Sequence, residues 1–206
     1  MYIPKSFAET ETAVLYQFMQ ANSFATILTT QDNAIAATHL PFLVDSVRGM
    51  LRAHMARANP QWQAFDGRQA LVIFQGPHAY VSPTWYESQP SVPTWNYTAV
   101  HAHGVPSIIT DERAVHEMLA ELVVTNERGR QPEWKLDVPA DYLHGMMRGI
   151  VAFELRIERI EGVFKLSQNH SMTDQQNVAA HLAQSTYVSD QAVGELMTQR
   201  GARTSA

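Results

Sequence analysis

The short connections between strand-like segments constrain the fold of this chain more than any other feature. Segments 24–30, 34–44, 50–56, 69–76 and 149–162 are rich in β-branched or alternating apolar residues. Few connections reach the dozen or more residues that a parallel crossover requires. Neighbouring strands are therefore expected to pair antiparallel, with the first two segments forming a hairpin across the turn-prone sequence QDN.

Helical periodicity is strongest in three segments. Residues 6–21 carry apolar side chains at helical spacing, and residues 110–124 form an apolar stripe behind an acidic first turn. Thr110 is suited to cap the second of these helices. A third helical segment is expected to begin near Thr173, where the spacing to Gln176 suits a capping box.

Strands and helices together predict an α+β chain built on an antiparallel barrel. The 206 residues are compatible with one domain, which we expect to cover 1–200. Its last part, about 171–200, is expected to be helical, and residues 201–206 are expected to form a disordered tail.

Composition argues against several classes of protein. The absence of cysteine excludes disulfides, thiolate metal sites and a cysteine nucleophile. A net charge of −5 argues against a broad DNA-binding face. Neither the glycine-rich loops of nucleotide-binding folds nor a G-x-S-x-G elbow occurs. Because no signal peptide pattern or membrane-length apolar run is present, we expect a cytoplasmic protein that binds no membrane.

The stretch PTWNYTAVHAHG concentrates aromatic rings and imidazoles in one segment. If residues 94–103 form a strand, Trp95, Tyr97, His101 and His103 share one face. Such a row could fill a core or a subunit interface, or it could line a groove for a flat ligand. The two histidines could also bind a metal ion, but no third ligand follows them closely, and we expect no metal site.

Two further segments carry polar side chains that suit an anion. In HMARANP, His54, Arg57 and the helix start at Asn59 could hold a phosphate group. In FKLSQN, Lys165 ends an apolar strand and precedes donors suited to an anion or a carbonyl-rich ring: Ser167, Gln168 and Asn169. The alternative is that FKLSQN is simply a strand end that turns into a capped helix.

Taken in order, five motifs resemble those of a known family. MYIPKSF, THLPF, HMARANP, PTWNYTAVHAHG and FKLSQN follow one another as in the PaiB-type FMN-binding negative transcriptional regulators, and the resemblance spans about residues 1–185. That family is similar to the pyridoxamine-phosphate-oxidase-like FMN-binding split barrels. The resemblance implies an α+β fold, an antiparallel six-stranded split β-barrel with flanking helices, and a homodimer with FMN in the groove between subunits.

The resemblance also implies which residues contact FMN. Side chains of THLPF are expected near the flavin ring, and those of HMARANP near the ribityl phosphate. Residues of PTWNY, VH and KLSQN are expected at the dimer groove. The implied cofactor-binding residues are Thr38, His39, Leu40, His54, Met55, Arg57, Asn59, Trp95, Asn96, Tyr97, His101, Lys165, Ser167, Gln168 and Asn169.

The resemblance leaves three functions open. The first is a negative transcriptional regulator that acts as a homodimer, directly or indirectly; the absence of a basic face argues against direct DNA binding. The second is an FMN-dependent oxidoreductase similar to flavin reductases. The third is a haem-binding or haem-degrading split barrel, because related split barrels handle haem. The motifs identify no catalytic residue.

Overall fold

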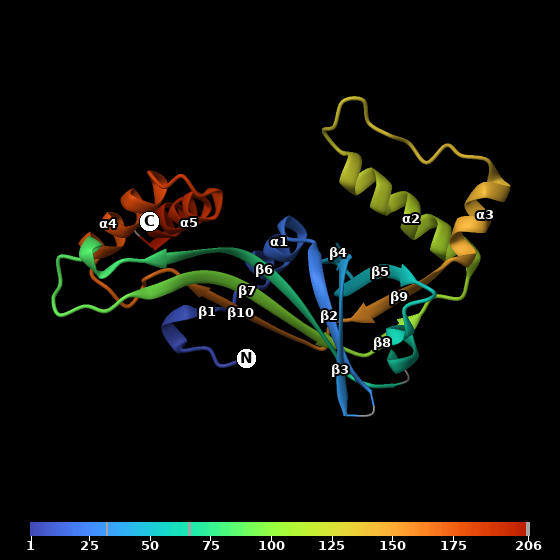
Figure 1. Cartoon of the computed structure of the whole chain (residues 1–206), viewed down its shortest axis with the longest axis horizontal. Coiled ribbons are helices and arrows are strands. Elements are labelled where there is room, and N and C mark those ends of the chain that lie inside the picture. Colours follow the sequence, from blue (N-terminus) through green and yellow to red (C-terminus); the bar gives the residue numbers. More distant parts are fainter. Residues whose placement is uncertain (32, 66, 205–206) are drawn as a thin grey trace. The chain divides into compact units, whose positions relative to one another are not determined.

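The computed structural model describes residues 1–31, 33–65 and 67–204, and it combines α-helices with antiparallel β-strands (Figure 1). The helices are α1 (Thr12–Ala21), α2 (Glu112–Glu127), α3 (Ala140–Arg148), α4 (Met172–Ala183) and α5 (Val188–Thr204). The strands are β1 (Ala8–Glu9), β2 (Phe24–Gln31), β3 (Ala34–Pro41), β4 (Leu43–Asp45), β5 (Met50–Ala56), β6 (Ala70–Val81), β7 (Thr94–Gly104), β8 (Pro106–Ile108), β9 (Ile150–Arg156) and β10 (Arg159–Lys165). Short 3-10 helices are η1 (Lys5–Phe7), η2 (Pro60–Phe65) and η3 (Pro83–Trp85).

The strands form two antiparallel sheets. One has the order β1-β10-β7-β6-β2-β3, and the other has the order β4-β5-β9-β8. The predicted hairpin is confirmed, because β2 and β3 pair antiparallel with Ala25 opposite Leu40. In the second sheet β5 pairs antiparallel with β9, with Ala53 opposite Phe153. Among the described residues, no helix is both long enough and apolar enough to cross a membrane.

The described residues fall into two compact units, and neither is continuous in sequence. Unit 1 comprises residues from 1–15, 75–100 and 161–206, and unit 2 comprises residues from 16–74 and 101–160. Strands β6 and β7 contribute residues to both units.

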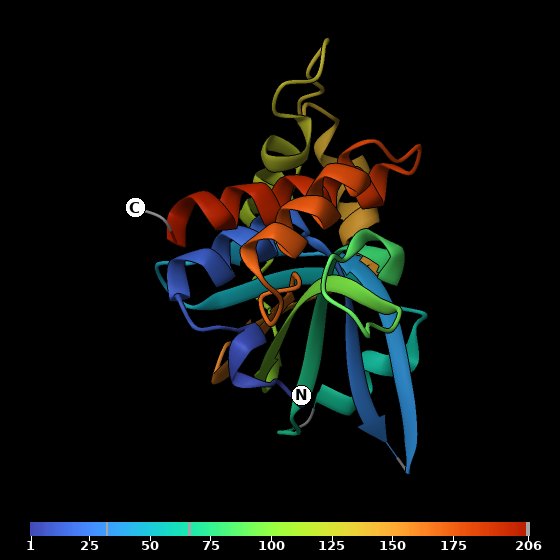
Figure 2. The ribbon, with the colours of Figure 1, turned by 90° about the vertical axis from the view of Figure 1, so that its left-hand side faces the viewer.

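Unit 1 contains the packed helix pair α4 and α5 (Figure 2). Their close approach depends on Gly194 of α5, because a Cβ there would lie 3.1 Å from the carbonyl oxygen of Ala179. Val178 and Leu182 of α4 and Val193 of α5 are fully buried. The helical segment expected from the sequence thus corresponds to two helices, and α5 continues to Thr204. Residues 205–206 of the expected tail lie outside the described residues.

Unit 2 has its own apolar core behind α2. The predicted stripe of this helix supplies Val115, Met118 and Leu122, which cluster with Leu43 of β4 and Ala152 of β9. The helix is capped by Asp111, whose side chain accepts a hydrogen bond from the Arg113 amide, so the predicted cap at Thr110 was wrong by one position. A carboxylate caps a helix as well as a hydroxyl does, and it also complements the helix dipole.

Three predicted elements were wrong in extent. Only residues 12–21 of the first predicted helix are helical, because residues 8–9 pair with β10 instead. Segment 34–44 divides at Phe42 into β3 and β4, which belong to different sheets. Segment 149–162 likewise divides into β9 and β10. Periodicity within a strand does not reveal where the chain passes from one sheet to the next.

Two further differences concern helices. α4 begins one residue earlier than predicted, and its cap is Ser171, whose hydroxyl accepts from the Asp174 amide at 3.1 Å. α3 was not predicted at all. Its nine residues are too few to be stable without tertiary contacts, and its apolar residues form only a short stripe.

Gly104, the last residue of β7, offers a test of the packing in unit 2. A Cβ at this position would overlap the backbone carbonyl oxygen of Arg156 and crowd Leu155. We expect Gly104→Ala to lower the free energy of unfolding by about 2 kcal/mol or more, since backbone cannot yield as a side chain can. Urea denaturation measures the change. Gly145→Ala in α3 is the matched control and should be neutral or stabilising, because a Cβ there would meet only the Arg148 guanidinium, at an ordinary contact distance of 3.9 Å. Equal effects of both substitutions would contradict this packing.

Candidate functional site

The two faces of strand β7 differ in composition, as the sequence predicted, and its first residues also alternate in exposure. Asn96 and Thr98 are fully buried, whereas Trp95 is 54% and Tyr97 is 37% exposed. The row of rings therefore does not fill the interior of the chain. It remains available as a surface for a flat ligand or another protein.

Two residues of β6 extend this ring surface within unit 1. The ring of Tyr80 lies edge-on to that of Trp95, with centroids 5.8 Å apart, and the His78 ring lies 6.1 Å from Trp95. Tyr80 is 46% exposed. We call Tyr80, Trp95 and Tyr97 the aromatic surface. Sequence reasoning missed Tyr80, although its place in the strand neighbouring PTWNY was a usable signal.

Lys165, in the same unit, is hydrogen-bonded to the start of β7. Its ammonium donates to the carbonyl oxygen of Trp95 at 2.5 Å and to the hydroxyl of Thr94. The Phe7 ring lies 5.9 Å from the ammonium, a cation–π distance. Loss of hydration lowers the pKa of Lys165. Two of its three N–H donors are thus used within the chain, and one is left for an anion or a carbonyl group.

The rest of the KLSQN motif forms the turn between β10 and α4. Ser167 is buried at a positive φ of 63° and exchanges hydrogen bonds with the buried Asn96. Gln168 bonds to the backbone of Leu166 and Phe164. Only Asn169 is exposed. The polar groups of Asn96, Ser167 and Gln168 therefore shape the turn, as the alternative reading of this segment held.

In unit 2 a buried amide organises the THLPF and ANPQW motifs. Gln61 is 3% exposed, and its amide donates to the carbonyl oxygens of Ile27 and Ala36 at 3.1 Å each. Its side-chain oxygen accepts from Thr38, and the Asn59 amide donates to the Thr38 hydroxyl at 2.9 Å. Thr38 and Asn59 are thus tied to each other. Sequence reasoning missed Gln61, because a glutamine beside an N-cap gives no distinctive pattern.

The remaining residues of THLPF and of β5 differ in exposure. Leu40 and Met55 are buried and contribute packing. His39 is exposed, and its Nδ1 lies 2.8 Å from the Thr26 hydroxyl. His54 is partly buried, and its Nδ1 atom is buried without a hydrogen-bond partner. Burial lowers the pKa of His54. Since an unpaired buried polar atom is costly, His54 is a candidate for bonding a ligand.

Arg57 follows β5 and clamps the end of α3. Its guanidinium donates to the carbonyl oxygens of Arg148 at 2.8 Å and Ile150 at 2.7 Å. Two of its five N–H groups are used in this way, which leaves three for a bound anion. Arg57 therefore has a structural role that the sequence did not reveal, together with donors to spare.

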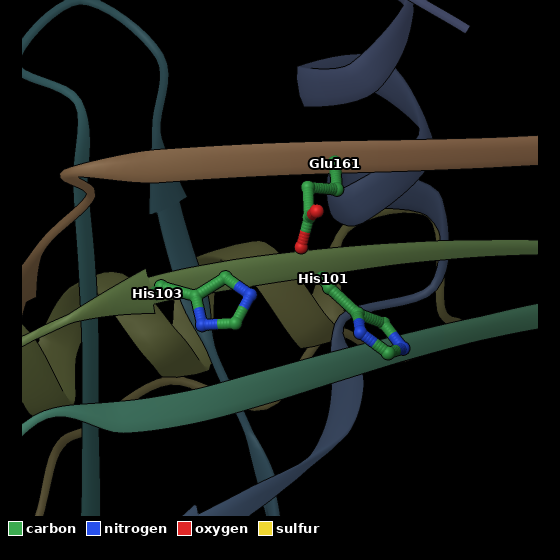
Figure 3. A group of neighbouring side chains, drawn as sticks. All are labelled: His101, His103 and Glu161. Atoms are coloured by element: carbon green, nitrogen blue, oxygen red, sulfur yellow. The ribbon is translucent and has the colours of Figure 1, made fainter. Parts of the chain in front are cut away.

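His101 and His103 lie on β7 in unit 2, with ring centroids 6.4 Å apart. Nδ1 of His103 lies 3.1 Å from the Arg159 guanidinium. Figure 3 draws both rings with Glu161, the one carboxylate of the described residues that completes a set of three potential metal ligands. Glu161 belongs to unit 1, where it pairs with the N-terminal ammonium of Met1 at 3.2 Å. The cation beside His103 and the ion pair of Glu161 both compete with a metal ion, so we assign none.

Comparison with known proteins shows to which family the chain belongs. The family described as "Putative FMN-binding domain" matches residues 1–159. The chain belongs to this family. It is also 37% identical over 203 residues to "Protease synthase and sporulation protein PAI 2" of Bacillus subtilis, covering 97% of this chain and 98% of that protein. Membership of the PaiB-type family, inferred from five motifs, is confirmed.

Solved structures of similar fold confirm the split-barrel architecture. The flavocytochrome Anf3 from Azotobacter vinelandii has a TM-score of 0.63 at 14% identity, over 79% of this chain and 72% of that one. The FAD and haem binding protein from Mycobacterium smegmatis has a TM-score of 0.63 at 17% identity, over 84% of this chain and 79% of that one. At such identities the likeness concerns the fold alone. The α+β split barrel expected from the sequence is confirmed.

Each of the two units carries side chains that suit part of an FMN molecule. A flavin needs a flat apolar surface for its ring, donors for the ring carbonyls and cationic donors for its phosphate. Unit 1 offers the aromatic surface, and unit 2 offers the unpaired Nδ1 of His54 and the three spare N–H groups of Arg57. Each unit by itself thus carries side chains of a kind that suits one part of the cofactor named by the family.

The lowered pKa of His54 predicts a pH dependence of stability. Below the ordinary value of about 6.5, the unfolded chain takes up a proton at this residue more readily than the folded protein does. Folding stability from the neutral imidazole is therefore present above about pH 6.5 and is lost as the pH falls through the folded pKa. When the pH is lowered from about 7.5 to about 5, chemical denaturation should show a smaller loss of unfolding free energy for His54→Asn than for the wild type. An identical dependence of unfolding free energy on pH in the two proteins would contradict the lowered pKa of His54.

Proposed function

We propose that this chain binds FMN and acts as a homodimeric regulatory protein of the PaiB type. The observation that carries the proposal is the match of residues 1–159 to an FMN-binding domain family. The similarity to the B. subtilis protein supports it over nearly the whole length of both chains. FMN, when bound, supplies hydride or electron transfer chemistry that no side chain of this protein can provide.

The side chains differ in the part they would take in binding. Trp95 and Tyr97 would pack against the flavin ring, because they are exposed and flat. His54 would satisfy its unpaired Nδ1 on a polar ligand atom, and Arg57 would donate to the phosphate. His39, His101 and Asn169 are further candidates. The remaining predicted residues would act indirectly by holding these side chains in place: Thr38, Leu40, Met55, Asn59, Asn96, Lys165, Ser167 and Gln168.

The regulatory role is proposed from the similarity to the B. subtilis protein, and its indirect character is proposed from the net charge of this chain. The name of the B. subtilis protein refers to protease synthesis and sporulation. With a net charge of −5, this chain lacks the excess of cations that neutralises DNA phosphates. We therefore propose that its regulatory effect is indirect. Retention on DNA that falls with rising salt would instead indicate direct contact with DNA.

A second candidate is an FMN-dependent oxidoreductase, because an accessible flavin can pass hydride or electrons to a substrate. Consumption of NADH or NADPH by the FMN-loaded protein would favour it over a binding module. Haem is the alternative ligand, since the two proteins of similar fold are named as a flavocytochrome and as an FAD and haem binding protein.

A visible absorption spectrum tests the cofactor directly. Purified protein is incubated with FMN, passed through a gel-filtration column and scanned. We expect flavin bands at ~370 and ~450 nm to elute with the protein. The elution volume should match the proposed homodimer.

Two results would contradict the proposal. A Soret band acquired from haem, together with no retained flavin, would replace FMN by haem. A colourless protein after incubation with either cofactor would leave the split barrel without a bound cofactor. FMN retained by a monomer would contradict the dimer alone.

A further inference from the structure

A hollow of about 300 Å³ lies in unit 2 between the start of α2, the end of α3 and the strands β8 and β9. None of its lining residues belongs to the aromatic surface. Its size is at the lower end of the range for small-molecule sites. Its walls combine two kinds of residue, one charged and one apolar.

The charged wall carries an excess of cations. Arg57 and Arg148 both line the hollow, and neither forms an ion pair among the described residues. Glu112 is the only carboxylate of the lining. His144 also lines it, and its Nδ1 lies 2.9 Å from the Ala140 carbonyl oxygen, so Nδ1 carries the proton. Two guanidinium groups beside one carboxylate leave a net positive charge in a concave place.

The Arg57 side chain is fixed in orientation by hydrogen bonds within the chain. Its bonds to the carbonyl oxygens of Arg148 and Ile150 fix the plane of the guanidinium and leave three N–H groups free. Arg148 is exposed in the last turn of α3. A carboxylate or phosphate can accept two parallel hydrogen bonds from a guanidinium group. Such charge-assisted pairs are stronger than hydrogen bonds between neutral groups.

The rest of the lining is largely apolar. Val115 and Ala152 are buried members of the unit 2 core, and Ile109, Met147 and Ile150 pack against them while remaining partly exposed. A polar ribityl chain would gain little from such a surface. An aliphatic or aromatic group would gain free energy in proportion to the apolar area that it removes from water.

We propose that this hollow binds a small organic anion, whose carboxylate or phosphate group contacts Arg57 and Arg148 and whose apolar body lies on Ile109, Met147 and Ile150. The hollow shares Arg57 with the contacts proposed for FMN. Arg148 is outside the residues assigned to the cofactor, so its substitution separates the two sites.

Isothermal titration of the full chain with phenyl phosphate tests the proposal, with inorganic phosphate as the probe that lacks an apolar body. Arg148→Gln should weaken phenyl phosphate binding about tenfold or more, because a charge-assisted hydrogen bond is lost. Glu112→Gln should tighten it a few-fold, since a repelling charge is removed. Arg128→Gln is the matched control, because Arg128 is exposed at the end of α2 and outside the hollow. FMN retention should be unchanged in all three variants.

Four outcomes would overturn the proposal. Undetectable binding of phenyl phosphate at millimolar concentration would exclude the site. Equal weakening by Arg148→Gln and Arg128→Gln, or equal affinity for phenyl phosphate and inorganic phosphate, would reduce it to general attraction by surface charge. Displacement of phenyl phosphate by stoichiometric FMN would make the hollow the phosphate site of the cofactor. Failure of the chain to retain FMN, with the phenyl phosphate results as expected, would contradict only the proposed function.

Discussion

The structure is organised around strand β7, which has one face in the protein interior and the other face accessible to solvent. Every second side chain of β7 enters the interior, including the fully buried Asn96, Thr98 and Val100. Of the intervening positions, Trp95 and Tyr97 are exposed, whereas the small Ala99 is buried. Large exposed aromatic side chains are costly to hydrate unless something covers them. The same alternation that builds the interior therefore creates the surface to which we assign the flavin ring.

Buried polar side chains hold the segments around that strand and around β3 in place. In unit 1 the Asn96–Ser167 pair joins residues 71 positions apart. In unit 2 Gln61 bonds to backbone groups of both β2 and β3. Such bonds contribute only about 1 kcal/mol each, but an unmade bond at a buried site costs more, so they restrict the chain to one arrangement. Many polar residues of the family motifs thus serve the geometry of the fold.

The sequence predicted what depends on local periodicity and connection length. Antiparallel pairing, the β2–β3 hairpin and the two faces of β7 follow from these, and the motifs identified the family. Contacts between distant segments could not be predicted in the same way. Arg57 bonds to the end of α3, a helix that is too short to be recognised from sequence periodicity. Gln61 acquires its hydrogen-bond partners only when β2 and β3 are paired. A motif specifies which side chains are present, whereas folding decides which of them keep free hydrogen-bonding groups.

The dissociation constant of FMN for Trp95→Leu measures the central claim most directly, namely that the exposed face of β7 receives the flavin ring. Quenching of flavin fluorescence gives this constant for the wild type, for Trp95→Leu and for Trp134→Leu. Trp134 is a matched control, since it is 51% exposed in unit 2 and lies outside the aromatic surface. We expect an increase of about tenfold or more for Trp95→Leu, as lost ring stacking implies, and no change for Trp134→Leu. Equal dissociation constants for all three proteins would contradict the assignment of the flavin ring to β7.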